Sequence, residues 1–540
     1  MRQHLLASAV ILGVARSQNN SSSHCCRALE DAGLQSALIY PEDVSTFEAS
    51  VGKYFSQIAQ LSPQCFLQPG NTAEVAQAVT ALVAANQTQH CQFAVRSGGH
   101  ISWPGAAGIE DGVTIDLGRM KEISYSSKDD TVSVGPGAVW GEVYQALDKL
   151  NVMTTGGRSS SVGVSGLTIG GGNSFFAAQY GFVCDNVASF EVVLGNGTTV
   201  TASKDDNPDL FQVLKGGNLN FGIVTKVVLN TFPGGPFFGG NVIYPADTAD
   251  QQFKALVNFG NGINDDRHAS TIVIGYHDSE KNSTVFLNAY EYTKPVQRPD
   301  AKIFKEFFSI PGNISDTTGL RNMTSLAHEF ESPKDRRVQF ATLTFKSDIR
   351  VLQRAHESFL KVIEELNGRM NGGYFQAWTL YQPIPTIFAK HGLEKGGNVM
   401  GLDRYDDTLI MYETYFRWEE TENDQVIEEQ SQWLRDDIQS FAASVGADAD
   451  WLYLNYADKD QKALEGYGAE NVAKIRAAAQ LYDPQGVFQN MVPGGFKISR
   501  VAETTPNGQP ATSAASRNLG YTVDALRWLV QAGCMLSKRR

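Results

Sequence analysis

The chain has 540 residues, of which 42% are hydrophobic and 19% are charged, so it can bury more than one core and is neither disordered nor fibrous. The 45 Lys and Arg against 58 Asp and Glu give a net charge of -13. This charge disfavours nucleic acids and anionic membranes as partners, because both attract proteins through negative charge. The 51 glycines exceed the usual share of about 7%. Glycine is costly to order, so the excess indicates tight turns or backbone held close to a ligand.

The first 17 residues are predicted to be a secretory signal peptide. Arg2 and His4 precede an apolar run from Leu5 to Val14, and small residues follow for cleavage. The run is too short to span a bilayer, and the alternative is an ordinary N-terminal helix. Seven Asn-X-Ser/Thr sites also agree with a secreted glycoprotein: Asn19, Asn20, Asn86, Asn196, Asn282, Asn313 and Asn322. The protein is expected to be a monomer with no membrane partner.

The six cysteines lack the paired spacing of a zinc site, and we expect no metal. In an oxidising compartment Cys25 and Cys26 can form two disulfides with Cys65 and Cys91. The sequence leaves open which cysteine pairs with which. Cys184 is predicted to be a buried thiol.

The first half of the chain alternates short helices with strands punctuated by glycine. A lead-in at 18–61 contains a helix near 45–61, and a helix at 71–85 has Thr72 as its expected N-cap. Strands are expected at 93–95, 113–117 and 131–134, and a helix at 139–150. A strand at 190–194 turns tightly at 195–197 into another at 198–202, and a further strand covers 222–229.

A Pro- and Gly-rich segment at 232–236 predicts a domain boundary. Beyond it, strands such as 270–276 and 408–418 alternate with helices such as 348–366, which predicts an α+β second lobe extending to about 450. Residues 451–498 are compact and rich in turns, and 501–540 form a polar tail expected outside the fold. The phosphate-loop, zinc-protease and esterase motifs are all absent from the sequence.

Glycines concentrate in two runs, Arg96-Ser97-Gly98-Gly99-His100 and the segment 156–173. Both follow strands, and neither is expected to open a helix in the manner of a Rossmann fold. Successive glycine amides can form an anion-binding nest, which would let an acidic chain hold a pyrophosphate with few basic side chains. The alternative is that these glycines only make turns in a β-rich protein.

Several segments in one order resemble the flavin domain of the vanillyl-alcohol-oxidase superfamily, in particular fungal berberine-bridge-enzyme-like oxidoreductases. They are the two glycine runs and residues 180–187, 190–197, 207–211, 215–224, 453–458 and 493–497. The resemblance covers about 62–498. It implies a two-lobe α+β fold of the FAD-binding PCMH type, with an FAD-binding domain at 62–232 and an antiparallel-sheet substrate domain at 237–450. Residues 451–498 would close over the flavin.

The resemblance also implies the cofactor-binding residues. His100 would bond covalently to the 8α-methyl group of FAD, although a lone histidine is more often a core residue. Arg96 would support the strand end. Ser159 stands where plant relatives carry a second, cysteine attachment, so a single histidyl link is expected. The remaining expected cofactor contacts are Ser97, Gly98, Gly99, Gly163, Val164, Ser165, Gly166, Gly170, Ile223, Val224 and Asn455.

Tyr456, the second tyrosine of Tyr-x-Asn-Tyr, corresponds to a catalytic base in several relatives. A phenol has a pKa near 10, so this role requires local stabilisation of the anion, and the alternative is a core tyrosine. In an extended strand Asn455 would face away from Tyr456. Relatives can carry a second acid or base on the strand that precedes a tryptophan, here Trp418. Met411, which is inert, aligns with that position, and Glu413 lies two residues further on the same face of the strand. Charged strand residues usually meet solvent. Gln376, Trp378 and Tyr381 are candidates to line the same cavity, with packing in the core as the default alternative.

The resemblance therefore predicts an FAD-linked oxidase that takes hydride from a small organic substrate, typically a fungal secondary metabolite. Molecular oxygen is the expected acceptor, giving hydrogen peroxide. A secreted carbohydrate oxidase of the same family is the alternative enzyme. A ligand-binding glycoprotein without turnover is the alternative outside enzymes.

Overall fold

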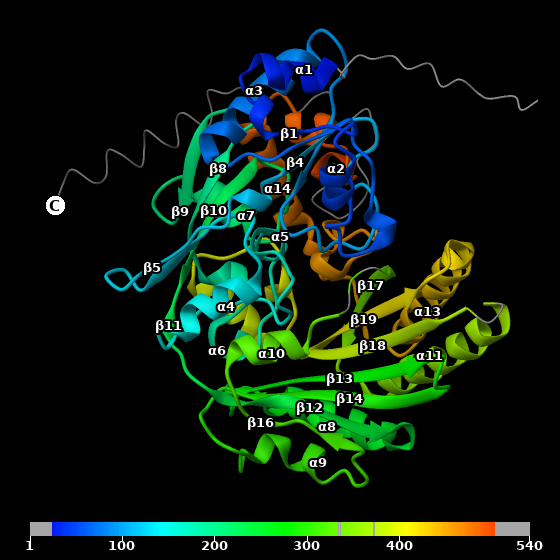
Figure 1. Ribbon diagram of the computed structural model, residues 1–540. Coiled ribbons are helices and arrows are strands. Elements are labelled where there is room, and N and C mark those ends of the chain that lie inside the picture. The colour runs from blue at the N-terminus through cyan, green and yellow to red at the C-terminus, as the bar shows by residue number, and fades with distance from the viewer. Residues whose placement is uncertain (1–23, 333, 335, 371–372, 503–540) are drawn as a thin grey trace, which may run out of the picture.

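The computed structural model describes residues 24–332, 334, 336–370 and 373–502. The predicted signal peptide, Asn19, Asn20, Cys534 and the tail beyond residue 502 lie outside the described residues. Two lobes stack on one another (Figure 1). Helices and mainly antiparallel sheets are mixed in both, so the predicted α+β class is confirmed.

The first lobe contains two main sheets. In the smaller one, β2, β4 and β3 run parallel and β1 joins antiparallel; the larger one is antiparallel, in the order β5-β6-β10-β8-β9. The strands are β1 Leu38–Ile39, β2 Cys65–Leu67, β3 Phe93–Arg96, β4 Val113–Asp116, β5 Ile123–Ser126, β6 Thr131–Val134, β8 Val187–Val193, β9 Thr199–Ser203 and β10 Ile223–Asn230. A two-stranded ribbon, β7 Val152–Met153 with β11 Phe232–Pro233, leads to the second lobe.

The helices of the first lobe are α1 His24–Asp31, α2 Val44–Val51, α3 Thr72–Asn86, α4 Trp140–Asp148, α5 Val164–Ile169, α6 Ala177–Tyr180 and α7 Pro208–Leu214. Two helix boundaries differ from those predicted. The helix near residue 45 ends at Gly52 and is followed by a separate turn, and the N-cap of α3 is Asn71, whose side chain accepts from Glu74 N. Asparagine caps better than threonine because its short carbonyl reaches the free amides of the first turn.

The lead-in is fastened to the first lobe. α1 packs against α3 over a separate cluster of buried apolar side chains. Disulfides join Cys25 to Cys91 and Cys26 to Cys65, which settles the pairing that the sequence left open. Cys184 is a buried free thiol, as predicted.

The second lobe is built on one large antiparallel sheet, in the order β15-β12-β14-β13-β18-β19-β17-β20 with β16 also on β12. Its strands are β12 Phe237–Pro245, β13 Ala269–Asp278, β14 Ser283–Tyr292, β15 Ser315–Asp316, β16 Gly319–Arg321, β17 Arg337–Lys346, β18 Phe375–Ile384, β19 Leu409–Trp418 and β20 Asp448–Ala449. Its helices are α8 Ala249–Gly262, α9 Lys305–Phe308, α10 Met323–Glu329, α11 Ile349–Arg369, α12 Thr386–Glu394 and α13 Asp424–Ser444.

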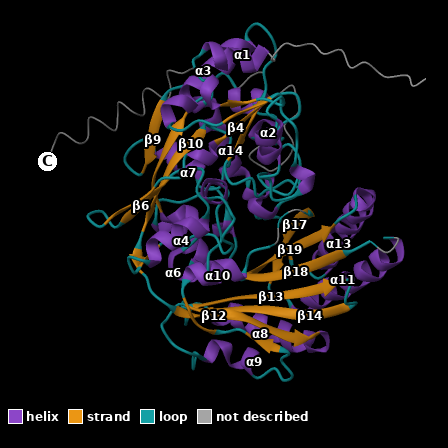
Figure 2. Ribbon diagram, viewed as in Figure 1, coloured by secondary structure: helices purple, strands orange, loops and turns teal. Residues whose placement is uncertain are grey.

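The helices α8, α11 and α13 cover one face of this sheet, and the first lobe lies over the other (Figure 2). The chain then returns to the first lobe through α14 Ala469–Tyr482. Val501, placed in the tail by the sequence analysis, is only partly exposed, and its carbonyl accepts from Arg476 Nη2 at 2.9 Å. Val501 therefore packs with the fold, although the sequence analysis placed it in the tail. Within the described ranges, no helix combines the length and apolar character needed to cross a membrane.

Candidate active site

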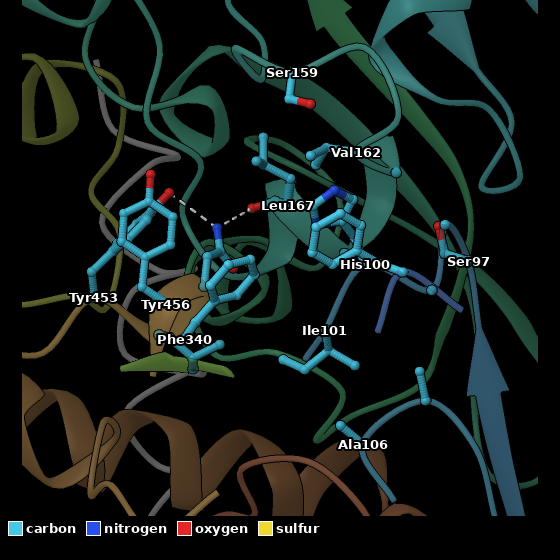
Figure 3. Close-up of a pocket in the computed structure, with 18 of the residues that line it drawn as sticks. Ser97, His100, Ile101, Ala106, Ser159, Val162, Leu167, Phe340, Tyr453 and Tyr456 are labelled. Atoms are coloured by element: carbon cyan, nitrogen blue, oxygen red, sulfur yellow. Dashed lines mark hydrogen bonds between the residues drawn. The ribbon is translucent and has the colours of Figure 1, made fainter. Parts of the chain in front are cut away.

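A cavity of about 510 Å³ lies where the two glycine runs of the first lobe meet the open face of the large sheet. Residues from the C-terminal segment complete its wall. Most of the predicted site residues line it: Ser97, Gly98, Gly99, His100, Ser159, Gly163, Ser165, Gly166, Ile223, Val224, Glu413, Asn455 and Tyr456. Three others, Arg96, Val164 and Gly170, lie behind the wall. Figure 3 shows part of this cavity, with His100 between Ser97 and the two tyrosines 453 and 456.

The two glycine runs touch each other through their backbones. A Cβ on Gly98 would come within 2.6 Å of Gly163 backbone atoms, and one on Gly163 within 2.7 Å of Gly98. Only glycine at both positions allows this approach. The second run does open a short helix, α5, with Gly163 as its N-cap, contrary to the sequence-based expectation. No proline interrupts the segment 163–169, so it can form a helical turn. At the start of the helix, Val164 N donates to Ala138 O at 3.0 Å.

The first turn of α5 leaves space for a cofactor. Gly166 lines the cavity, and a Cβ added there would meet nothing within 4 Å. Beside it, the buried Ser165 hydroxyl has no hydrogen-bond partner among the described residues. Buried hydroxyls are normally satisfied, so this one is suited to a polar ligand. A groove lined by glycine, with an unpaired hydroxyl beside it, fits the phosphate-bearing part of a dinucleotide such as FAD.

Arg96 supports the first run from beneath. Its guanidinium donates to Asp116 Oδ2 at 2.9 Å and to Ser50 O at 2.7 Å, and it stacks over the rings of Tyr54 and Phe66. The Arg96 guanidinium holds the pKa of the buried Asp116 carboxyl below its usual range, against the effect of burial. The arginine therefore acts on the strand end and does not reach the cavity.

His100 is held by stacking. Its ring lies 4.0 Å from that of Phe55, at 14° between planes, and Nε2 lies 3.5 Å from Ser161 Oγ. Burial lowers the pKa of His100 to about 4 because the charged form would lose its hydration. The imidazole is therefore neutral at ordinary pH. A neutral ring has a nitrogen lone pair free to bond to an electrophile.

Tyr456 is hydrogen-bonded to an arginine from the second glycine run. Arg158 Nη2 donates to Tyr456 Oη at 2.6 Å. Burial raises the pKa of Tyr456, and the Arg158 charge acts against that rise. The sequence analysis required such a partner but did not identify it. The available signal was that Arg158 is the single basic residue in the segment 156–173.

The segment around Tyr456 is a tight turn and not the predicted strand. Leu454–Tyr456 form one turn of 3-10 helix, so successive side chains are about 120° apart. Asn455 and Tyr456 consequently both line the cavity, which corrects the expectation that they face opposite ways. Asn455 Nδ2 donates to Leu167 O at 2.9 Å and to Tyr453 Oη at 3.1 Å (Figure 3). Tyr453 Oη also accepts from Asn173 N, a structural role that the sequence analysis did not assign.

Glu413 points from β19 into the cavity and is only 5% exposed. Burial raises its pKa to about 8, an effect that the Arg158 charge partly offsets. The carboxyl is therefore mostly protonated at neutral pH. The expectation that a charged strand residue meets solvent is wrong here, because the first lobe covers this face of the sheet.

The rest of the sheet wall is mainly apolar, with Asn241 of β12 as a further polar side chain. From β13, β14 and β18, the side chains that line it are Ile272, Ile274, Leu287, Trp378 and Leu380. Of the three candidates for this wall, only Trp378 lines the cavity, and Tyr381 packs in the core, as the default alternative has it. Tyr381 points to the opposite face, where its ring lies 5.2 Å from Phe253 of α8, because neighbouring positions of a strand alternate. Gln376 donates to Tyr276 Oη near the end of the strand.

Comparison with known proteins agrees with this geometry. The family model described as an FAD binding domain matches residues 63–203. The FAD-dependent monooxygenase drtC of Aspergillus calidoustus is 38% identical over 480 residues, covering 89% of this chain and 91% of that protein.

Two solved structures share the fold. Berberine bridge enzyme from Eschscholzia californica has a TM-score of 0.68 and 17% identity, covering 87% of this chain and 99% of that one. Xylooligosaccharide oxidase from Myceliophthora thermophila C1 has a TM-score of 0.70 and 19% identity, covering 91% and 100%.

Proposed function

Because the chain belongs to the FAD-dependent oxidoreductase family that includes drtC, we propose that it oxidises a small organic molecule, a fungal secondary metabolite, with dioxygen as acceptor. One observation carries this proposal. The glycine cradle with His100 and the pair Tyr456 and Glu413 face a single cavity. Cofactor site and acid–base groups on one cavity are what a redox reaction with proton transfer requires.

The cofactor would be held by the two glycine runs and bonded to His100. Gly98 and Gly163 bring the two backbones together, Gly166 leaves the groove free, and Ser165 offers an unused hydroxyl. Bound FAD supplies a two-electron acceptor for the hydride of a substrate C–H bond. Ser159 lines the cavity without a thiol, so we propose a single covalent link.

The chain's own part in the reaction is proton transfer and orientation. Tyr456 would accept the proton of a substrate hydroxyl at its phenol oxygen, with Arg158 as its hydrogen-bond donor. Glu413, protonated at neutral pH, would donate a hydrogen bond to a substrate oxygen from the sheet side. The aromatic and aliphatic wall would exclude water. Two-electron reduction of dioxygen would yield hydrogen peroxide.

The sheet wall favours a largely apolar substrate over a sugar. Apart from Glu413 and Asn241, its lining side chains are aliphatic or aromatic, and the rings of Trp378 and Tyr415 lie 4.4 Å apart. A carbohydrate needs several polar partners for its hydroxyls, since an unpaired buried hydroxyl costs free energy. A carbohydrate oxidase therefore remains the second candidate, supported by the fold shared with xylooligosaccharide oxidase.

The cofactor proposal is tested by acid precipitation. The wild-type pellet should keep its yellow colour, whereas His100→Ala should release FAD into the supernatant or contain none. A colourless wild-type pellet would contradict covalent attachment. Purified protein free of flavin that cannot be reconstituted would favour the ligand-binding glycoprotein.

The reaction is tested by peroxide release against two panels, one of phenolic and polycyclic alcohols and one of oligosaccharides. We expect turnover with the first panel and a fall of about 100-fold or more in flavin reduction for Tyr456→Phe. Wild-type rates in that variant would remove the proposed base. Incorporation of ¹⁸O from labelled dioxygen into product, without peroxide, would instead indicate monooxygenation, the activity in the name of the relative drtC.

We also propose that the protein is secreted as a monomer. Two disulfides in the N-terminal region suit an oxidising compartment. Four of the predicted glycosylation sites, Asn196, Asn282, Asn313 and Asn322, are exposed, and Asn86 is partly exposed. Analysis of the culture medium tests secretion, glycosidase treatment tests glycosylation, and size-exclusion chromatography tests the monomeric state.

A further inference from the structure

Arg158 is held in place by the loop that carries it. Gly156 and Gly157 lie against the Trp140 ring so closely that a Cβ on either would collide with it. The Tyr144 hydroxyl donates to Gly157 O at 2.6 Å. The backbone that leads into Arg158 is therefore fixed by glycine packing and a buried hydrogen bond, and the side chain starts from a defined point.

The guanidinium makes no ion pair with a described carboxylate within 4 Å. Arg158 Nη2 instead donates a hydrogen bond to the Tyr456 hydroxyl at 2.6 Å, across 298 residues of sequence. Arg158 is only partly buried and lines the cavity. A guanidinium stays charged at every ordinary pH, so its positive charge is directed at one phenol oxygen.

We propose that Arg158 stabilises the phenolate form of Tyr456, so that the proton acceptor is an arginine–tyrosine pair formed by the second glycine run and the C-terminal segment. The inference rests on the proposed role of Tyr456. Resting Tyr456 loses its proton to solvent, and the phenolate then takes one proton from a substrate hydroxyl to become phenol again. Arg158 keeps all its protons and acts as a positioning residue.

The other ionisable groups near Arg158 limit the pH range of this pair. Glu413 from β19 and Glu291 from β14 are buried carboxyls whose pKa burial raises, so at neutral pH they add little negative charge. Above about pH 8 Glu413 ionises and competes with the phenolate for Arg158. The other ionisable groups that interact with Arg158 are the phenols of Tyr453 and Tyr144. Burial raises the pKa of both, so neither adds charge at neutral pH.

The test uses the holoenzyme with Arg158→Met and Arg158→Lys. An opposite charge at this range lowers an acid's pKa by about 1–3 pH units. In Arg158→Met, the acid limb of the pH profile for flavin reduction should therefore move to higher pH by that amount. Each pH unit of this shift should make flavin reduction at neutral pH about tenfold slower. Arg158→Lys should recover part of the loss. The pH titration of tyrosinate absorbance, measured as the difference between the protein with Tyr456 and its Tyr456→Phe counterpart, should also move to higher pH in Arg158→Met.

Two comparisons separate this role from general damage. In the Tyr456→Phe background, Arg158→Met should cause little further loss, because the partner is already gone. Arg350→Met, an arginine of α11 paired with Asp348, is the matched control and should behave as wild type. Equal losses from Arg158→Met in both backgrounds, or an unmoved acid limb and tyrosinate titration, would overturn the inference. A Tyr456→Phe variant with wild-type rates would instead contradict the proposed function.

Discussion

The side-chain amide of Asn455 occupies the space where a Cβ of residue 170 would stand, closer to Gly170 than van der Waals contact allows for any other residue. The same amide donates to Leu167 O at 2.9 Å. One asparagine thus joins the end of α5 to the turn that carries Tyr456. The missing side chain at position 170 is what allows the two segments to meet.

Gly170→Ala should therefore displace Asn455. The φ of Gly170 is -96°, which alanine also adopts, so any loss comes from the contact and not from the backbone. We expect a loss of about 1–3 kcal/mol in unfolding free energy, as for overpacked sites, together with slower turnover because Tyr456 follows Asn455 directly. Denaturant unfolding and flavin reduction rates measure both effects. If both the unfolding free energy and the flavin reduction rate are unchanged, the Asn455 amide can adopt another position without loss.

Gly166→Ala is the matched change in the same helix, with the opposite expectation. Its Cβ would meet no protein atom within 4 Å, and alanine favours helix by up to about 1 kcal/mol over glycine. The apoprotein should be as stable as wild type or more so, while the FAD content of the purified protein falls because the methyl group stands in the cofactor groove. Full FAD content in this variant would place the cofactor elsewhere in the cavity.

Glu413→Gln should change how stability depends on pH. The folded pKa of Glu413 is about 8 against 4.5 for a free side chain, so the folded state holds the extra proton between these values. The protonated Glu413 therefore contributes fully to the stability of the folded state below about pH 4.5, and this contribution is lost as the pH rises through about 8. The variant should thus gain stability relative to wild type from pH 5 to 8, by about 2–4 kcal/mol at the upper end.

Melting curves at several pH values measure this difference, with Glu364→Gln as the control. Glu364 is an exposed carboxyl of α11, and its variant should run parallel to wild type. A Glu413→Gln curve that is also parallel to wild type would show that Glu413 is ionised in the fold.

The two disulfides should each contribute to the stability of the first lobe. They close loops with separations of 66 residues for Cys25–Cys91 and 39 for Cys26–Cys65. The chain-entropy relation gives about 4 kcal/mol for each, so replacing either pair by alanine should lower the melting temperature clearly. Peptide mapping without reductant should recover these two pairs. Recovery of Cys25 with Cys65 would contradict the fold of the lead-in.

Sequence periodicity predicted the features that depend on neighbours in the chain. The alternation of β19 placed Met411 and Glu413 on one face, and the Asn196-Gly197 turn joins β8 to β9 as expected. Burial of Glu413 could not be predicted, because it depends on the first lobe covering the sheet. The aromatic segment at 453–456 suggested a strand, but Asn455 bonds across to Leu167 and the chain turns instead. The Arg158–Tyr456 bond joins segments 298 residues apart, and no local pattern reports it.

The neutral state of His100 predicts how FAD attachment depends on pH. Burial lowers the pKa of this imidazole to about 4, whereas a free histidine has a pKa near 6.5. The neutral ring required for bonding is therefore fully present at pH 5.5 and above. Covalent incorporation of FAD into apoprotein should proceed at a nearly constant rate between pH 5.5 and 7.5.

An exposed histidine would behave differently, because its neutral fraction falls about tenfold for each unit below its pKa. Phe55→Ala, which removes the ring stacked on His100 at 4.0 Å, opens the site to water and should shift the acid limb of attachment upward toward pH 6.5. Fluorescence of the flavin on denatured protein bands measures attachment. The melting temperature at each pH serves as control, because a partly unfolded protein would also attach FAD slowly. A tenfold slower attachment at pH 5.5 in folded wild-type protein would mean that His100 is protonated there and that its environment is wetter than the stacking implies.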